Sequence, residues 1–214
     1  MAQIFIAHSR RDKDLRDFFS NVFGTTNVKP VFEEFEKILK GKRTSSEIEK
    51  DIQNSKAVFV VLSQNVQDIP CTRDWVVWET GVAKNKDIWI FEPYQQLGNI
   101  SVVIPYLRHY VIFNTSDAWF AYICEIIKSY DDSHVLPTLL VAGGIGALLA
   151  EKDKTGGAAL GALAGLVISD KSKDRPTGIG VTCKNCSSSY NIHIQQDMKM
   201  FRCPVCNTHL KIAI

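Results

Sequence analysis

Strand and helix patterns alternate from residue 1 to about residue 132 of this chain, which has 214 residues. The clearest strand is the apolar run Ala57–Leu62, which has no polar residue and is typical of a parallel strand buried on both faces. The expected strands are 3–7, 28–32, 57–62, 87–91 and 110–113, and the expected helices are 12–23, 44–53, 72–85 and 118–130. This alternation predicts an α/β fold, a doubly wound (flavodoxin-like) five-stranded parallel sheet.

Two of the expected helices begin with residues that favour a helix start. Thr44-Ser45-Ser46-Glu47 has the spacing of a capping box, in which the threonine and glutamate side chains satisfy backbone N–H groups. Asp12 precedes the first helical pattern and is a candidate N-cap.

Charge divides the chain into parts. The net charge of +2 is too small for a protein that coats nucleic acid. Residues 1–134 carry 16 basic and 18 acidic side chains, whereas residues 170–214 carry 7 basic and 3 acidic. We expect a globular domain at 1–132, an apolar segment at 135–169, a linker at 170–180 and a small domain at 181–214. The start lacks a secretory pattern, so we expect a cytoplasmic protein.

Polar residues follow two of the expected strands. His8-Ser9-Arg10-Arg11 comes after the first strand and Ser63-Gln64-Asn65 after the third. The carboxyl ends of parallel strands form the ligand-binding edge of such sheets. Arginines beside a helix start suit a diphosphate, although a solvated basic helix start has the same pattern.

Three segments together resemble TIR domains over residues 1 to about 130. Ile4–Asp12 is similar to their opening strand and loop, and Glu47–Ser63 to their second helix and third strand. Asp74–Glu79 contains Trp-x-x-x-Glu one short loop further on, where bacterial and archaeal TIR domains carry a catalytic glutamate.

The resemblance implies an enzyme that cleaves NAD⁺, an NADase, and a role in antiviral defence or signalling. It also implies homo-oligomers formed through the TIR domain, with active sites shared between protomers and activity that depends on this assembly. Its products would be nicotinamide and ADP-ribose or cyclic ADP-ribose. Glu79 would be catalytic, with Ser9, Arg10, Phe32 and Trp75 binding substrate. A fixed carboxylate suits this chemistry because the sugar becomes oxocarbenium-like as nicotinamide departs. The alternative interpretations of the TIR pattern are a non-enzymatic scaffold and a nucleotide-responsive membrane receptor.

The segment 135–169 is rich in glycine and alanine. Two uncharged runs, 135–150 and 155–169, flank the charged residues 151–154, and Gly157, Gly161 and Gly165 repeat every four residues. This spacing lines up small residues on one helix face and resembles glycine-zipper hairpins. Sixteen residues of helix span about 24 Å, short of the roughly 30 Å hydrocarbon core of a bilayer. Membrane insertion, self-association into homo-oligomers and a simple pair of core helices therefore all stay open.

Four of the six cysteines lie near the C-terminus. Cys183, Cys186, Cys203 and Cys206 form C-x₂-C-x₁₆-C-x₂-C, the spacing of a zinc ribbon. Four thiolates close a tetrahedral site, so we expect a structural Zn²⁺ between strands at 190–194 and 210–214. His193, Lys199, Arg202 and Lys211 are the only obvious nucleic-acid contacts, which argues against nucleic acid as the partner. Cys71 and Cys124 stand alone and are expected to be ordinary buried residues.

Overall fold

The computed structural model describes residues 1–33, 41, 43–97, 103–104, 106–131, 176–195, 198 and 200–211. The glycine-rich hairpin expected at 135–169 and the segment from Glu34 to Lys40 lie outside the described residues.

Elements alternate along the chain much as the sequence predicts. The strands are β1 Gln3–Ala7, β2 Lys29–Glu33, β3 Ala57–Val61, β4 Asp87–Pro93, β5 His109–Phe113, β6 Thr177–Thr182, β7 Ser189–Ile194, β8 Met200–Arg202 and β9 His209–Lys211. The helices are α1 Lys13–Gly24, α3 Ser45–Asn54, α4 Gln64–Asp68, α5 Pro70–Val82, the 3₁₀ turn η1 Tyr94–Gln96 and α6 Asp117–Lys128. Every strand and helix expected in the globular domain at 1–132 is present, with small shifts at its ends.

The main sheet has seven strands rather than the five expected. Its order is β2-β1-β3-β4-β5-β7-β6, in which neighbouring strands are parallel except for the antiparallel pair β6–β7. The first five strands have the order 2-1-3-4-5 of a doubly wound sheet. Strands from the cysteine-containing region extend this sheet, because β7 pairs with β5 through Asn191 opposite His109. The strand β6 covers residues 177–180 of the segment expected to be a linker.

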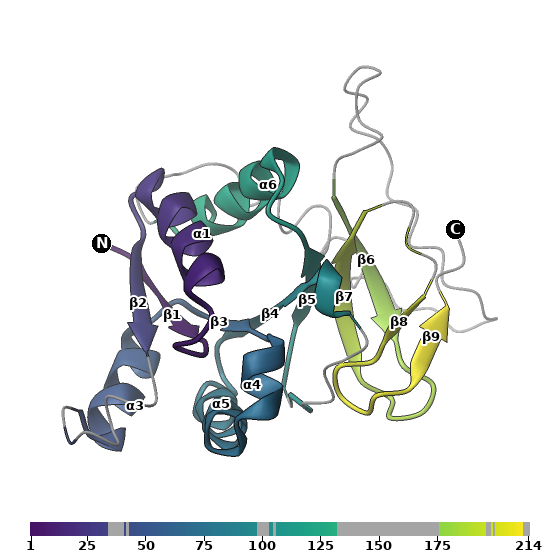
Figure 1. Cartoon of the computed structure of the whole chain (residues 1–214), viewed down its shortest axis with the longest axis horizontal. Helices are drawn as coiled ribbons and strands as arrows, with labels where there is room; N and C mark the ends of the chain where they lie inside the picture. Colours follow the sequence, from purple (N-terminus) through teal and green to yellow (C-terminus); the bar gives the residue numbers. More distant parts are fainter. Residues whose placement is uncertain are drawn as a thin grey trace, which may run out of the picture.

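Helices cover both faces of the sheet. Figure 1 shows α1 and α6 on one face and α3, α4 and α5 on the other. Aromatic side chains dominate the α1–α6 side, where Phe19, Phe59, Phe91 and Trp119 are fully buried. A buried aromatic side chain of this kind contributes about 2–3 kcal/mol. The opposite core packs Ile48 and Ile52 from α3 and Val76 from α5 against the strands. It continues through residues such as Ile192 and Phe201 into the cysteine-containing region from β6 to β9, which we call the ribbon.

The starts of α3 and α1 show where the local patterns succeed and fail. Thr44 accepts the N–H of Glu47 and Glu47 accepts the N–H of Thr44, so the predicted capping box is confirmed. Asp12 stands at the N-cap of α1, but its side chain makes no cap hydrogen bond. Asp12 is therefore the N-cap residue as expected, but it does not cap α1 through its side chain, because its carboxylate accepts other hydrogen bonds.

Candidate functional site

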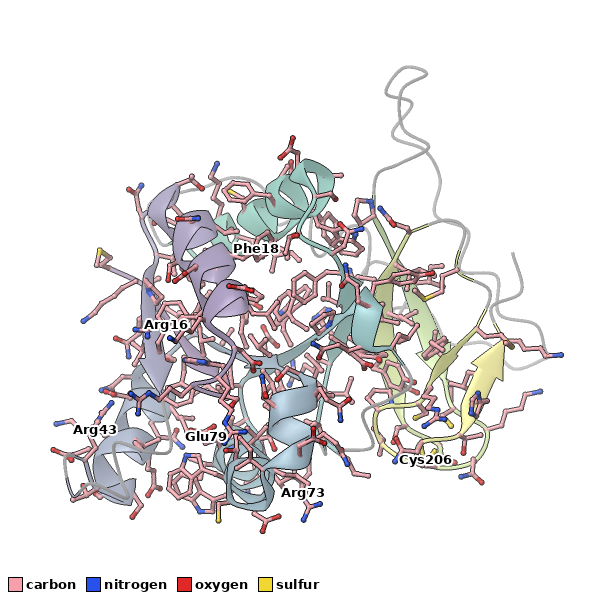
Figure 2. The ribbon with its side chains drawn as sticks, viewed as in Figure 1. Arg16, Phe18, Arg43, Arg73, Glu79 and Cys206 are labelled. Atoms are coloured by element: carbon pink, nitrogen blue, oxygen red, sulfur yellow. The ribbon has the colours of Figure 1, made fainter. Side chains whose placement is uncertain are left out.

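The carboxylate of Glu79 is buried on α5. The side chain is 2% exposed, and its Oε1 accepts a hydrogen bond of 2.8 Å from the indole Nε1–H of Trp75. The two residues are one helical turn apart, which places them on the same face of the helix. Trp78 stacks on Trp75, with ring centroids 4.5 Å apart and planes 27° apart. The carboxylate is thus held by a tryptophan pair, and Figure 2 shows it well apart from Cys206 in the ribbon.

Burial makes Glu79 unlike an ordinary helix carboxylate. Removing a carboxylate from water costs free energy unless hydrogen bonds or charges compensate it. Buried ionisable side chains with a fixed partner are over-represented at functional sites. The four-residue spacing of Trp75 and Glu79 in the sequence becomes a direct contact in the structure.

A second group of polar contacts ties together the carboxyl ends of β1, β3 and β4. The Asp12 carboxylate accepts hydrogen bonds from Ser63 Oγ at 2.5 Å and from Asn65 Nδ2 at 2.6 Å. The backbone N–H of Gln64 donates to Gln96 Oε1, just after β4, at 2.7 Å. The two loops that the sequence singled out therefore meet. Asp12 joins them, although its sequence position indicated only a helix cap.

The expected substrate-binding residues of the first loop, and Phe32 on β2, have different surroundings. Ser9 is buried, and its Oγ accepts the backbone N–H of Arg11 at 3.4 Å, whereas Arg10 is exposed at the surface. Phe32 meets the ring of His8 edge-on at 5.6 Å, and the guanidinium of Arg16 lies 5.7 Å from the Phe32 ring centre. Sequence reasoning missed Arg16, since nothing in the chain pattern links it to Phe32.

The four C-terminal cysteines converge as the spacing predicts. Their sulfur atoms all lie within 4.8 Å of one another, with Cys183–Cys206 at 3.6 Å and Cys186–Cys203 at 3.8 Å. Tetrahedral Zn–S bonds of about 2.3 Å place neighbouring sulfurs about 3.8 Å apart, so this arrangement fits Zn²⁺. Disulfide sulfurs would be about 2 Å apart.

Two similar turns present these sulfurs. Cys183 O accepts from Ser187 N and Cys203 O accepts from Asn207 N, each at 2.8 Å. Ser187 and Asn207 both have φ of +58°, in the left-handed region, which lets the chain fold back behind each cysteine pair.

Local contacts move the thiol pKa values in opposite directions. A hydrogen bond with Thr208 lowers the pKa of Cys206 to about 6, whereas burial raises the pKa of Cys203 to about 12. Bound Zn²⁺ would hold all four as thiolates.

A cluster of rings joins the ribbon to the sheet. His109 Nδ1 lies 3.2 Å from His193 Nε2, and Tyr122 OH lies 2.6 Å from His193 Nδ1. Trp89 stacks on His109 with ring centroids 3.7 Å apart. Burial lowers the pKa of His193 to about 3 and that of His109 to about 4, so both imidazoles are neutral near pH 7. His193 is 1% exposed in this cluster, so its side chain is not available for the nucleic-acid contact that the sequence already disfavoured.

The two remaining cysteines differ. Cys124 is buried as expected, with its sulfur 3.2 Å from Thr25 Oγ1, but Cys71 is exposed, so the expectation that it is buried is wrong.

Among the helices of the described residues, none combines the length and apolar character needed to cross a bilayer.

In comparisons with known proteins, no family model matches this chain and no curated protein matches it.

Proposed function

We propose that this chain is an NAD⁺ glycohydrolase or cyclase of the TIR type, with Glu79 as its catalytic carboxylate. The observation that carries the proposal is the buried carboxylate of Glu79, held at one oxygen by Trp75 in a doubly wound α/β domain. The resemblance of Trp-x-x-x-Glu to TIR enzymes suggests NAD⁺ as the substrate. Cleavage of NAD⁺ requires a carboxylate that is buried and fixed in orientation, as the carboxylate of Glu79 is.

The chemistry needs one acidic side chain. Nicotinamide leaves NAD⁺ as a neutral molecule from a cationic state, so no general acid has to protonate it. The bond between C1 of the ribose and the pyridinium nitrogen breaks, and both bonding electrons go to that nitrogen. The ribose develops positive charge, which a preorganised carboxylate stabilises through space. Water then attacks the same carbon and loses a proton to solvent, giving ADP-ribose, or in a cyclase a ring nitrogen of adenine attacks it instead.

We propose that the phosphates and ribose of NAD⁺ bind at the carboxyl edge of the sheet. Ser9 and Arg10 lie beside the start of α1, where backbone N–H groups and the exposed guanidinium favour an anion. The bonds from Ser63 and Asn65 to Asp12 hold this loop in place from the β3 side. In the proposal, Phe32 forms an apolar wall. Shared active sites between protomers would make the activity depend on assembly.

The test is release of nicotinamide from NAD⁺ by the purified full chain, with products identified by mass spectrometry. Wild type is assayed dilute, concentrated and in the presence of lipid vesicles. Glu79→Ala is expected to abolish release, whereas the matched variant Glu49→Ala, at an exposed position of α3, retains it. If the Glu79 and Glu49 variants behave alike in every state, Glu79 is not catalytic, and retained biological activity in Glu79→Ala would favour the scaffold.

A further inference from the structure

The ribbon carries an open groove that the proposed enzymatic activity does not use. It has a volume of about 580 Å³ and lies between β6 and β9. The described residues that line it are Val181, Thr182, Lys184, Asn185, Thr208, His209, Leu210 and Lys211. These residues supply two ammonium groups, an imidazole, an amide, two hydroxyls and the apolar side chains of Val181 and Leu210, and none of them is acidic.

Two strand edges border this groove. In the described part of the chain, β6 pairs only with β7 and ends the seven-stranded sheet, while β9 pairs only with β8. Figure 1 shows these strands together at the end of the molecule opposite β2. Strand edges present backbone N–H and C=O groups that an added strand can pair with.

The register identifies which backbone groups of β6 point outward. Asn191 on β7 donates its N–H to Arg108 O, next to β5, at 2.9 Å. Directly opposite residues of an antiparallel pair point their backbone groups either toward each other or both away. Gly180 is opposite Asn191, so its N–H and C=O point away from β7. With the period of two in a strand, Gly178 and Thr182 point the same way.

We propose that this groove binds an extended acidic segment of a partner protein, which adds as a strand to the open edge of β6. Alternate side chains of the segment rest on Val181 and Leu210, and its carboxylates meet Lys184 and Lys211. The pattern fits a peptide better than a nucleic acid, because none of the described residues that line the groove is a phenylalanine, tyrosine or tryptophan that could stack on a base. Part of the positive charge balances the −2 net charge of a zinc–tetrathiolate centre, so the affinity is expected to be micromolar.

The binding experiment uses the zinc-loaded full chain and a fluorescein-labelled peptide of about eight alternating valine and glutamate residues. Fluorescence anisotropy is expected to show saturable binding. The double variant Lys184→Glu/Lys211→Glu weakens it at least about tenfold. The matched variant Lys50→Glu/Lys84→Glu makes the same charge change at exposed positions of α3 and the α5–β4 loop, and leaves it unchanged. Zinc content and circular dichroism establish that both variants are folded.

Two further probes separate strand addition from charge alone. N-methylation at alternate residues of the peptide removes backbone donors and is expected to abolish binding, and hydrogen exchange at Gly180 and Thr182 is expected to slow when the unmodified peptide binds. The proposal is overturned if the methylated peptide or a valine–lysine peptide binds equally well. It is also overturned if an oligothymidine of about eight nucleotides binds more tightly, if the matched variant loses as much affinity, or if the valine–glutamate peptide does not bind. None of these outcomes depends on cleavage of NAD⁺.

Discussion

The cysteine centre and the Glu79 carboxylate are formed in different ways. The cysteine centre is assembled from two short turns, each of which brings its own pair of sulfurs together. Glu79 becomes special only because α5 packs onto the sheet and buries it beside Trp75. A cysteine cluster suited to a metal can thus be specified by residue type and local spacing, whereas a buried carboxylate depends on tertiary packing.

The same contrast predicts which parts of the fold are disturbed by loss of a bound metal and which by substitutions in α5. The ribbon is an extension of the main sheet through the β5–β7 pair and the His109–His193 contact. Loss of the metal is therefore expected to disorganise the ribbon first and to reach the domain through β5. Changes at α5 are expected to alter chemistry while leaving the fold largely intact.

The largest effect is expected from Cys203→Ser. Cys203 is fully buried, and structural zinc contributes on the order of 10 kcal/mol to folding of a small metal-binding unit. The variant is expected to lose bound zinc, and the amides of β6 to β9 to lose hydrogen-exchange protection, while those of β1 and β3 keep theirs. Elemental analysis and exchange mass spectrometry measure both. The control is Cys71→Ser, at an exposed cysteine. An unchanged exchange pattern in zinc-free Cys203→Ser would mean that packing alone holds the ribbon.

An intermediate effect is expected from pH at the junction between the two regions. The pKa of His193 is about 3 and that of His109 about 4 in the folded protein, below the value of about 6.5 in an unfolded chain. Between about pH 3 and pH 6.5 the unfolded state therefore binds more protons than the folded state does. The free energy of unfolding is highest above about pH 6.5, and it falls by up to a few kcal/mol as the pH decreases toward 3.

Urea unfolding of zinc-loaded protein at several pH values from neutral to mildly acidic measures this loss. The variant His193→Gln is expected to flatten the pH dependence, and His209→Gln, at an exposed position of β9, is expected to leave it as in wild type. Zinc content is measured at each pH. Equal slopes in wild type and His193→Gln at constant zinc content would show that the buried histidines do not couple folding to protons.

The smallest effect on stability is expected from Trp75→Phe. The change removes the indole N–H that donates to Glu79 and costs about 1–2 kcal/mol of unfolding free energy. If Trp75 positions the carboxylate, nicotinamide release falls about tenfold with little change in KM. Trp78→Phe leaves the hydrogen bond in place and serves as the comparison. Equal kinetics in the two variants would show that the hydrogen bond has no role in catalysis.

Residues close in sequence carried most of what could be predicted. The strands and helices of the domain at 1–132, the capping box at Thr44 and the clustering of the four C-terminal cysteines each depend on local patterns. The pairing of β5 with β7 could not be predicted, because the two strands are far apart in the sequence and nothing local fixes their register. The burial of His193 and the use of Asp12 by Ser63 and Asn65 follow from such long-range contacts.

The rate of nicotinamide release at saturating NAD⁺ by Glu79→Gln decides whether this carboxylate performs the chemical step. The substitution keeps the size of the side chain and an oxygen that can accept from Trp75, but removes the negative charge. With folding and zinc content unchanged, the rate is expected to fall at least about a hundredfold, the scale of losing one preorganised electrostatic group, while binding of NAD⁺ changes little. A rate within a few fold of wild type would contradict the assignment of Glu79 as the catalytic residue.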